Sequence, residues 1–117
     1  MNISDQVQKM DALVAQGAIV DAVQSFFSKD AKTADYNDVT TATKDEMVSK
    51  MEGFVGSIAH VNGITHHRTI AEGNASASEF TFDFDMKDGN KILWHEIIRR
   101  IWNENGEVIA EEYFNAG

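Results

Sequence analysis

The stretch ASASEFTFDFDMKDGNKILWHEIIRRIW, residues 75–102, decides the fold. Its first part alternates with a period of two, which is typical of a strand with one buried face. The Asp88-Gly89 step predicts a tight hairpin turn, because glycine readily adopts the positive φ that such turns require. One face of this strand carries Phe80, Phe82, Phe84 and Met86, and the other carries Thr81, Asp83 and Asp85. Residues 75–102 are therefore predicted to be two antiparallel strands.

The second strand of this hairpin, KILWHEIIRRIW at residues 91–102, does not sort into an apolar and a polar face. One alternating set is Trp94, Glu96, Ile98, Arg100 and Trp102, and the other is Leu93, His95, Ile97, Arg99 and Ile101. A strand between core and water separates the two kinds of side chain. Because each set mixes them, we expect neither face to be simple core or simple surface.

The flanking sequence extends the sheet in both directions. ITHHRTIAE (64–72) and EVIAEEYFN (107–115) are predicted strands, and Asn103–Gly106 is a second hairpin turn. A short extended piece is predicted at residues 30–38. The sheet is therefore expected to be mainly antiparallel, with strands joined by hairpins.

The N-terminal half is predicted to be mainly helical. Apolar residues recur at helical spacing between residues 7 and 27, and Gly17 interrupts them, so we expect one bent helix or two short ones. Thr43 and Glu46 form a capping box that opens a further helix, which ends at residues 61–63. Helices followed by hairpin-linked strands predict an α+β fold, with the N-terminal helices packed in the concave face of a strongly curved sheet.

Composition excludes several classes of function. The 117 residues are expected to form a single domain, 1–117, and the chain has no cysteine, which excludes thiol chemistry and thiolate metal sites. The net charge of −9 argues against binding nucleic acid or an anionic membrane surface. The N-terminus lacks the pattern of a secretion signal and no apolar run is long enough to span a bilayer. A cytoplasmic location is therefore predicted.

Two stretches carry a resemblance to a known group of proteins. AQGAIVDAVQSFFSKDA (15–31) looks like a broken first helix leading into an acidic strand, and GNKILWHEIIRRIWNENGEVI (89–109) looks like two final strands around an Asn-Gly turn. With the order of elements, they resemble the nuclear transport factor 2-like superfamily, which includes ketosteroid isomerase and the SnoaL-like polyketide cyclases. The resemblance covers nearly the whole chain and implies a cone-shaped barrel with a cavity. Because that superfamily has many activities, the resemblance implies the fold and not a reaction.

Compared with ketosteroid isomerase, the chain retains one of three catalytic parts. Asp35 matches the general-base aspartate of that enzyme. Met10 or Asp11 falls where its tyrosine donor lies, and Ile98 falls where its protonated aspartate lies. Without these donors an enolate lacks its main electrostatic support, so steroid isomerisation by that mechanism is not expected.

The match at Ile98 implies which face of the strand at residues 91–102 lines the cavity. Ligand binding is then predicted for Trp94, Glu96, Ile98, Arg100 and Trp102, since small-molecule pockets are largely apolar with a few placed polar groups. The alternative is a core filled by both Trp side chains, with a structural Glu96–Arg100 pair. The opposite face is predicted to form a homodimer interface, as is common in the superfamily, through His95, Ile97, Arg99 and Ile101.

Further candidate site residues lie outside the strand at residues 91–102. Asp35 is predicted as the acid–base residue, with Tyr36 beside it in the pocket, although turn aspartates of this kind are common. His66 is an auxiliary candidate that would point inward together with Arg68. On the last strand, the isomerase match favours Glu111 and Tyr113 in the cavity, whereas hydrophobicity favours the set beginning at Val108.

Neither a metal site nor a cofactor is predicted, since the adjacent His66 and His67 diverge on a strand and no third ligand is evident. The favoured function is binding of a small apolar or carbonyl-bearing molecule. The alternatives are a proton-transfer enzyme using Asp35 as base, and an interaction module whose sheet face is the functional surface.

Overall fold

Two helices, one strand and a third helix precede the other four strands in the computed structural model, which describes residues 3–35 and 40–117. The order is α1 (Ser4–Ala15), α2 (Ile19–Phe26), β1 (Phe27–Ala34), α3 (Lys44–Gly56), β2 (Ile58–Glu72), β3 (Ala75–Met86), β4 (Lys91–Trp102) and β5 (Val108–Asn115). This order confirms the predicted α+β class. None of these helices is both long enough and apolar enough to span a membrane.

The helix boundaries follow local chemistry. Gly17 has a φ of 83°, which only glycine adopts readily, so the first helical region is two helices and not one bent helix. The Thr43 hydroxyl accepts a hydrogen bond from the backbone N–H of Glu46, as the capping box predicts. The prediction that this helix runs to residues 61–63 is wrong. It contains Gly53 and stops at Gly56, because the backbone from Ile58 onward pairs with β3.

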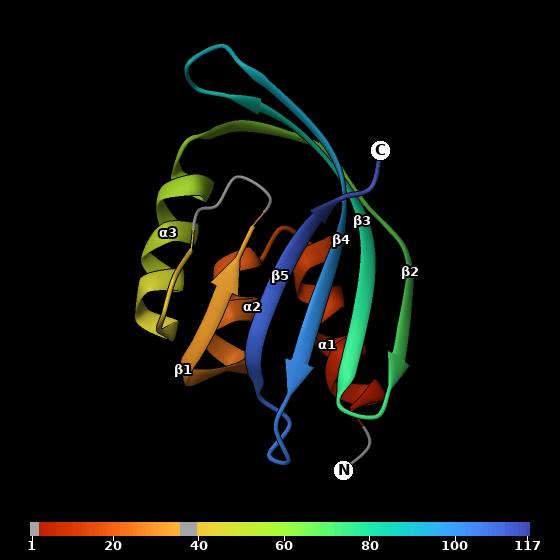
Figure 1. Cartoon of the computed structure of the whole chain (residues 1–117). Helices are drawn as coiled ribbons and strands as arrows, with labels where there is room; N and C mark the ends of the chain where they lie inside the picture. Colours follow the sequence, from red (N-terminus) through yellow and green to blue (C-terminus); the bar gives the residue numbers. More distant parts are fainter. Residues whose placement is uncertain (1–2, 36–39) are drawn as a thin grey trace.

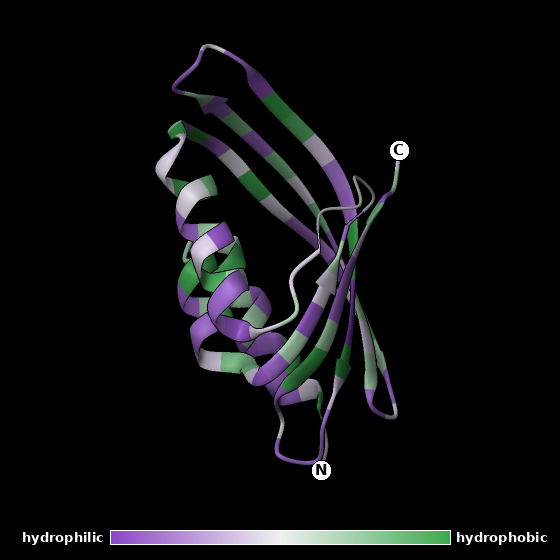
Figure 2. Cartoon of the chain, turned by 60° about the vertical axis from the view of Figure 1, so that its left-hand side comes forward, coloured by the Kyte–Doolittle hydropathy of each residue, from purple (hydrophilic) through white to green (hydrophobic). Residues whose placement is uncertain are grey.

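The five strands form one sheet in the order β1-β5-β4-β3-β2. The pairing of β1 with β5 is parallel and the other three pairings are antiparallel. The sheet curves strongly, and the helices lie in its concave face (Figures 1 and 2). Over the described residues the sheet stays open, with β1 and β2 as its edges, so the predicted cone does not close into a barrel.

The orientation of β4 is the one predicted. Glu96, Ile98, Arg100 and Trp102 are buried, and Trp94 is half-buried on the same side. On β3 the matching side carries the buried Phe80, Phe82 and Phe84, which pack against the helices. Alternation therefore leaves His95, Ile97, Arg99 and Ile101 on the convex face.

Two bulges explain why simple alternation of side chains does not predict the facing of every residue on β2 and β5. Between His66 and Arg68 the register against β3 shifts, so His66 faces α1 whereas Arg68 pairs with Glu79 on the convex side. The prediction that Arg68 points inward is therefore wrong. A second shift, at Ile101–Trp102 against β5, puts Val108 in the core. Beyond this shift Glu111 is buried as well. The Val108 set therefore faces the core at the start of β5, and the Glu111 set faces it further along the strand.

Candidate functional site

A pocket of about 130 Å3 opens on the concave side of the sheet, between α2, α3 and the inner face of β3, β4 and β5. Its walls are mostly apolar. Among the residues that the structure describes, the polar lining side chains are Asp35, Lys50, Glu96, Arg100, Glu111 and Tyr113. Seven of the predicted site residues border this pocket: Asp35, Trp94, Glu96, Ile98, Arg100, Glu111 and Tyr113. The fold thus brings together side chains from β4, β5 and the end of β1.

Aromatic rings form one wall of the pocket. Phe54 from α3 stacks on Trp94 from β4, with ring centroids 5.7 Å apart and planes inclined by 15°. Phe54 also meets Phe84 edge-on at 5.9 Å, and Phe82 lines the pocket beside it. Such a wall offers apolar area and the electron-rich faces of aromatic rings.

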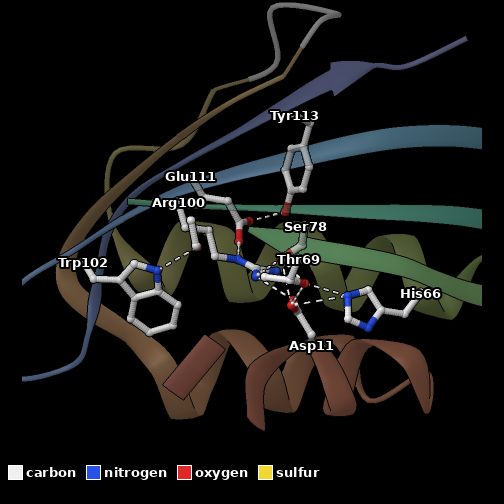
Figure 3. Close-up of polar contacts among 9 residues, drawn as sticks. Asp11, His66, Thr69, Ser78, Arg100, Trp102, Glu111 and Tyr113 are labelled. Atoms are coloured by element: carbon white, nitrogen blue, oxygen red, sulfur yellow. Dashed lines mark hydrogen bonds and ion pairs between the residues drawn. The ribbon is translucent and has the colours of Figure 1, made fainter. Parts of the chain in front are cut away.

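The polar floor of the pocket is a buried ion network centred on Arg100 (Figure 3). The Arg100 Nε donates to Glu111 Oε2 at 2.8 Å, and its Nη1 donates to Asp11 Oδ1 at 2.8 Å. The hydroxyl of Tyr113 donates to the other oxygen of Glu111. The side chains of Asp11, Arg100 and Glu111 are each no more than 2% exposed, so water screens these charges little.

Hydroxyl groups complete the coordination of Asp11. Its Oδ2 accepts hydrogen bonds from Thr69 Oγ1 at 2.7 Å and from Ser78 Oγ at 2.8 Å. The Nε2 of His66 lies 2.6 Å from Thr69 Oγ1 and 3.7 Å from Asp11 Oδ2. Because the Thr69 hydroxyl has one proton and donates it to Asp11, His66 Nε2 donates to Thr69. His66 therefore supports the network from its outer end.

The network shifts two pKa values. Burial disfavours the charged form of Arg100, but the carboxylates of Glu111 and Asp11 outweigh burial and raise the pKa of Arg100. Burial, followed by the carboxylate of Glu111, raises the pKa of Tyr113 well above its ordinary value. Both shifts fix the hydrogen-bonding roles. Arg100 remains a cation and Tyr113 remains a neutral donor at every physiological pH.

Asp35 lies on the pocket wall, where sequence comparison placed a general base. Its Oδ2 is 3.1 Å from the ammonium group of Lys50 on α3, and its side chain is 15% exposed. Asp35 is thus a paired, largely buried carboxylate on the pocket wall.

Two of the predicted residues that the structure describes are not part of the pocket lining. Trp102 is fully buried at the other end of β4, meets Phe26 edge-on and donates its indole N–H to Ser76. The prediction that it binds ligand is therefore wrong. His66 stacks on Phe80 and reaches Asp11 from outside the pocket. Tyr36 lies outside the described residues.

Asp11 is the functional-site residue that the sequence comparison undervalued. Asp11 was considered only as a replacement for the tyrosine donor of ketosteroid isomerase, and a carboxylate cannot take that role. Its spacing carried a different signal, since Val7, Met10 and Val14 form the apolar stripe of α1 and Asp11 falls on the same face. A carboxylate on a buried stripe needs a cationic partner, and Arg100 provides it.

No family model matches the chain, and no curated protein matches it. Solved structures do match. A candidate SnoaL-like polyketide cyclase from Mesorhizobium loti has a TM-score of 0.86 at 19% identity, covering 97% of this chain and 99% of that chain. An NTF2-like protein of unknown function from Burkholderia pseudomallei has a TM-score of 0.80 at 14% identity, covering 98% and 91%.

A third solved structure is a hypothetical protein with a ketosteroid isomerase-like fold from Catenulispora acidiphila, in complex with trimethylamine. Its TM-score is 0.78 at 13% identity, covering 95% of this chain and 85% of that chain. The chain therefore has the nuclear transport factor 2-like fold that the sequence resemblance implied. Identities this low establish the fold alone, so any function depends on the site described above.

Proposed function

We propose that the chain binds a small, largely apolar molecule in the pocket between the helices and the sheet. The observation that supports this proposal is the stacked Phe54–Trp94 wall facing a buried ion network. A mostly apolar hollow with a few placed polar groups is the usual composition of a small-molecule site. A cavity of about 150 Å3 accommodates a benzene-sized molecule, so a pocket of about 130 Å3 suits a body the size of a single ring.

The charges around the pocket favour a ligand head group that is positive or that donates hydrogen bonds. Among the described residues, the lining carboxylates are Asp35, Glu96 and Glu111, and Asp11 lies directly behind Arg100. Two cations offset these four carboxylates. Lys50 already pairs with Asp35, and Arg100 with Asp11 and Glu111. A carbonyl oxygen would compete with carboxylates for these donors, whereas an ammonium group would bring its own donors to a lining rich in acceptor oxygens.

The aromatic wall favours the same head group. A cation near the face of an aromatic ring is attracted by the ring quadrupole, and tryptophan is the strongest such partner. The Catenulispora protein, which has the same fold, was crystallised with trimethylamine. Together these observations support a small organic cation as the ligand class.

The test is a comparison of three probes that share a ring and differ in head group: benzylammonium, benzyl alcohol and benzoate. Fragments of this size bind with roughly millimolar affinity. We expect benzylammonium to bind at least about tenfold more tightly than benzoate, a difference of about 1.4 kcal/mol, with benzyl alcohol between them. Isothermal titration calorimetry measures the three affinities.

Matched variants locate the binding. Trp94→Ala removes the stacked wall and is expected to abolish measurable benzylammonium binding, and Glu96→Gln is expected to narrow the difference between the probes. Leu93→Ala is the control, because Leu93 is the neighbouring residue and is exposed on the opposite face. Equal affinity for benzoate and benzylammonium would contradict the proposed ligand class. Unchanged binding by Trp94→Ala would contradict the proposed site.

Proton transfer is the second candidate function. Asp35 supports it, because this carboxylate borders the pocket at the place of the general base in the isomerase match. In the network around Arg100, the Nε and Nη1 of Arg100 and the hydroxyl of Tyr113 already donate to carboxylates, which argues against their use as oxyanion donors for an enolate. Deuterium exchange into cyclohexanone that is lost in Asp35→Asn would favour catalysis, and its absence in the unmodified protein would exclude this reaction for that ketone.

We also propose that the chain forms a homodimer through the convex face of the sheet. Ile97 pairs across the strands with Phe114, which is 44% exposed, and Ile101 lies further along the same face of β4. Apolar side chains gathered on one exposed face favour association. The cytoplasmic location stays a prediction.

The dimer proposal predicts that Ile97→Lys halves the mass measured by light scattering after gel filtration, because a desolvated ammonium group opposes association at the centre of the patch. Val61→Lys is the control, since Val61 is also exposed but pairs with Phe84 at the far end of the hairpin. A monomeric unmodified protein would overturn the proposal, and so would a dimer that tolerates Ile97→Lys.

A further inference from the structure

Three strands bring two histidines and a glutamate together on the convex face. One ligand atom from each of His67 on β2, Glu79 on β3 and His95 on β4 lies within 4.8 Å of the others. The His95 Nε2 is 2.6 Å from Glu79 Oε2, and the rings of His67 and His95 have centroids 5.4 Å apart. This cluster is separate from the pocket, because it occupies the opposite side of the sheet.

The β2 bulge creates this cluster. His66 and His67 point to opposite sides of the strand, as expected for neighbours, but the bulge turns His67 and Arg68 together toward the convex face. There His67 contacts Thr81, which lies directly opposite His95. Glu79 is the diagonal neighbour of His95, within reach of its side chain. The further ligands that the sequence pattern did not reveal are thus Glu79 on β3 and His95 on β4.

Two imidazoles and one carboxylate are the donor set of zinc sites that keep an open position. In a tetrahedral zinc site with bonds of about 2.0 to 2.2 Å, the donor atoms lie roughly 3.4 Å apart. A maximum separation of 4.8 Å requires a contraction of up to about 1.4 Å. Rotation of the exposed His67 side chain can supply it without movement of the strands.

Arg68 already orients Glu79, one of the three side chains of the cluster. Arg68 Nε lies 3.0 Å from Glu79 Oε1, which orients the carboxylate and leaves Oε2 toward the histidines. The hydrogen bond from His95, with support from Arg68, lowers the pKa of Glu79 although burial opposes this.

We propose that His67, Glu79 and His95 form a binding site for one divalent transition-metal ion of the zinc type, with water completing the coordination. The site lies on β2, β3 and β4, whereas the apolar patch at Ile97 and Phe114 extends over β4 and β5. The two surfaces adjoin on the convex face, because Glu79 lies directly opposite Ile97 and His95 belongs to the predicted dimer face. The proposal does not depend on the function of the pocket.

Calorimetric titration of the folded, metal-free chain with Zn²⁺ tests the site, and one ion per chain is expected. His67→Ala, His95→Ala and Glu79→Gln should each weaken the affinity at least roughly tenfold, because each removes a ligand. His60→Ala is the matched control, since His60 is an exposed histidine on the same strand outside the cluster. Circular dichroism confirms that each variant is folded.

A second measurement needs no variant. In an NMR titration with Zn²⁺, the ring resonances of His67 and His95 should shift together and saturate at one equivalent, while those of His60 and His66 stay in place. No saturable binding, or binding that survives His67→Ala and His95→Ala unchanged, would overturn the proposal. So would ring shifts confined to His60 or His66. The cluster would then be a hydrogen-bonded cross-strand arrangement without metal.

Discussion

Arg100→Met is expected to destabilise the protein by about 3 to 5 kcal/mol, which is the usual cost of breaking a buried ion pair by removing one partner. Methionine retains the unbranched apolar stem of the arginine side chain, so most of the loss comes from the guanidinium charge and its hydrogen bonds. Asp11 and Glu111 remain buried in the variant without the cation that both contact at 2.8 Å. The midpoint and slope of urea denaturation give the free energy of unfolding.

Arg99→Met is the matched control for this experiment. Arg99 is the preceding residue on the same strand, but its ion pair with Glu112 is exposed on the convex face. Exposed pairs contribute about 0 to 1 kcal/mol, so this variant should unfold close to the unmodified protein. A small effect of Arg100→Met, similar to that of Arg99→Met, would show that the network does not stabilise the fold.

Trp102→Ala has the second large effect, a destabilisation of about 3 to 5 kcal/mol. The indole is 1% exposed, packs edge-on against Phe26 and donates to Ser76, so truncation leaves both a cavity and an unsatisfied buried hydroxyl. Thermal or urea unfolding measures the change. Ligand affinity of the folded fraction should not change, because Trp102 lies outside the pocket.

Trp94→Ala provides the opposite comparison. Its indole is half-buried and borders the pocket, so truncation enlarges an existing hollow and costs less stability than at Trp102. Binding of benzylammonium is lost instead. If Trp102→Ala lost ligand binding at full stability, or Trp94→Ala were the more destabilised variant, the assignment of the two indoles would be reversed.

Sequence patterns could predict the fold because the relevant signals are local. Alternation at residues 80–86, the Asp88-Gly89 turn and the Thr43–Glu46 capping box each act over a few residues. The buried phase of β4 was predictable only through the family match at Ile98, since each of its faces mixes apolar and charged residues. The sequence does not indicate how far along β4 the pocket extends, so ligand binding was predicted for both Trp94 and Trp102.

The ion network and the metal cluster depend on contacts between distant residues. Asp11 and Arg100 are 89 positions apart, and no local pattern indicates that they meet. The bulge after His66 turns Arg68 outward and brings His67 toward His95, yet no glycine marks it. A shift of one residue in register reverses which face each later side chain occupies, so these groups became visible only with the strand pairing.

The two Trp indoles allow a direct test of the central claim, that the pocket beside Trp94 binds a small organic cation. A ¹⁵N-labelled chain shows one indole N–H resonance for each tryptophan. Titration with benzylammonium is expected to shift the Trp94 resonance in a saturable way, while the Trp102 resonance, whose N–H is bonded to Ser76 in the core, stays in place. If the Trp94 resonance does not move while benzylammonium binds, or if nothing binds, the claim is wrong.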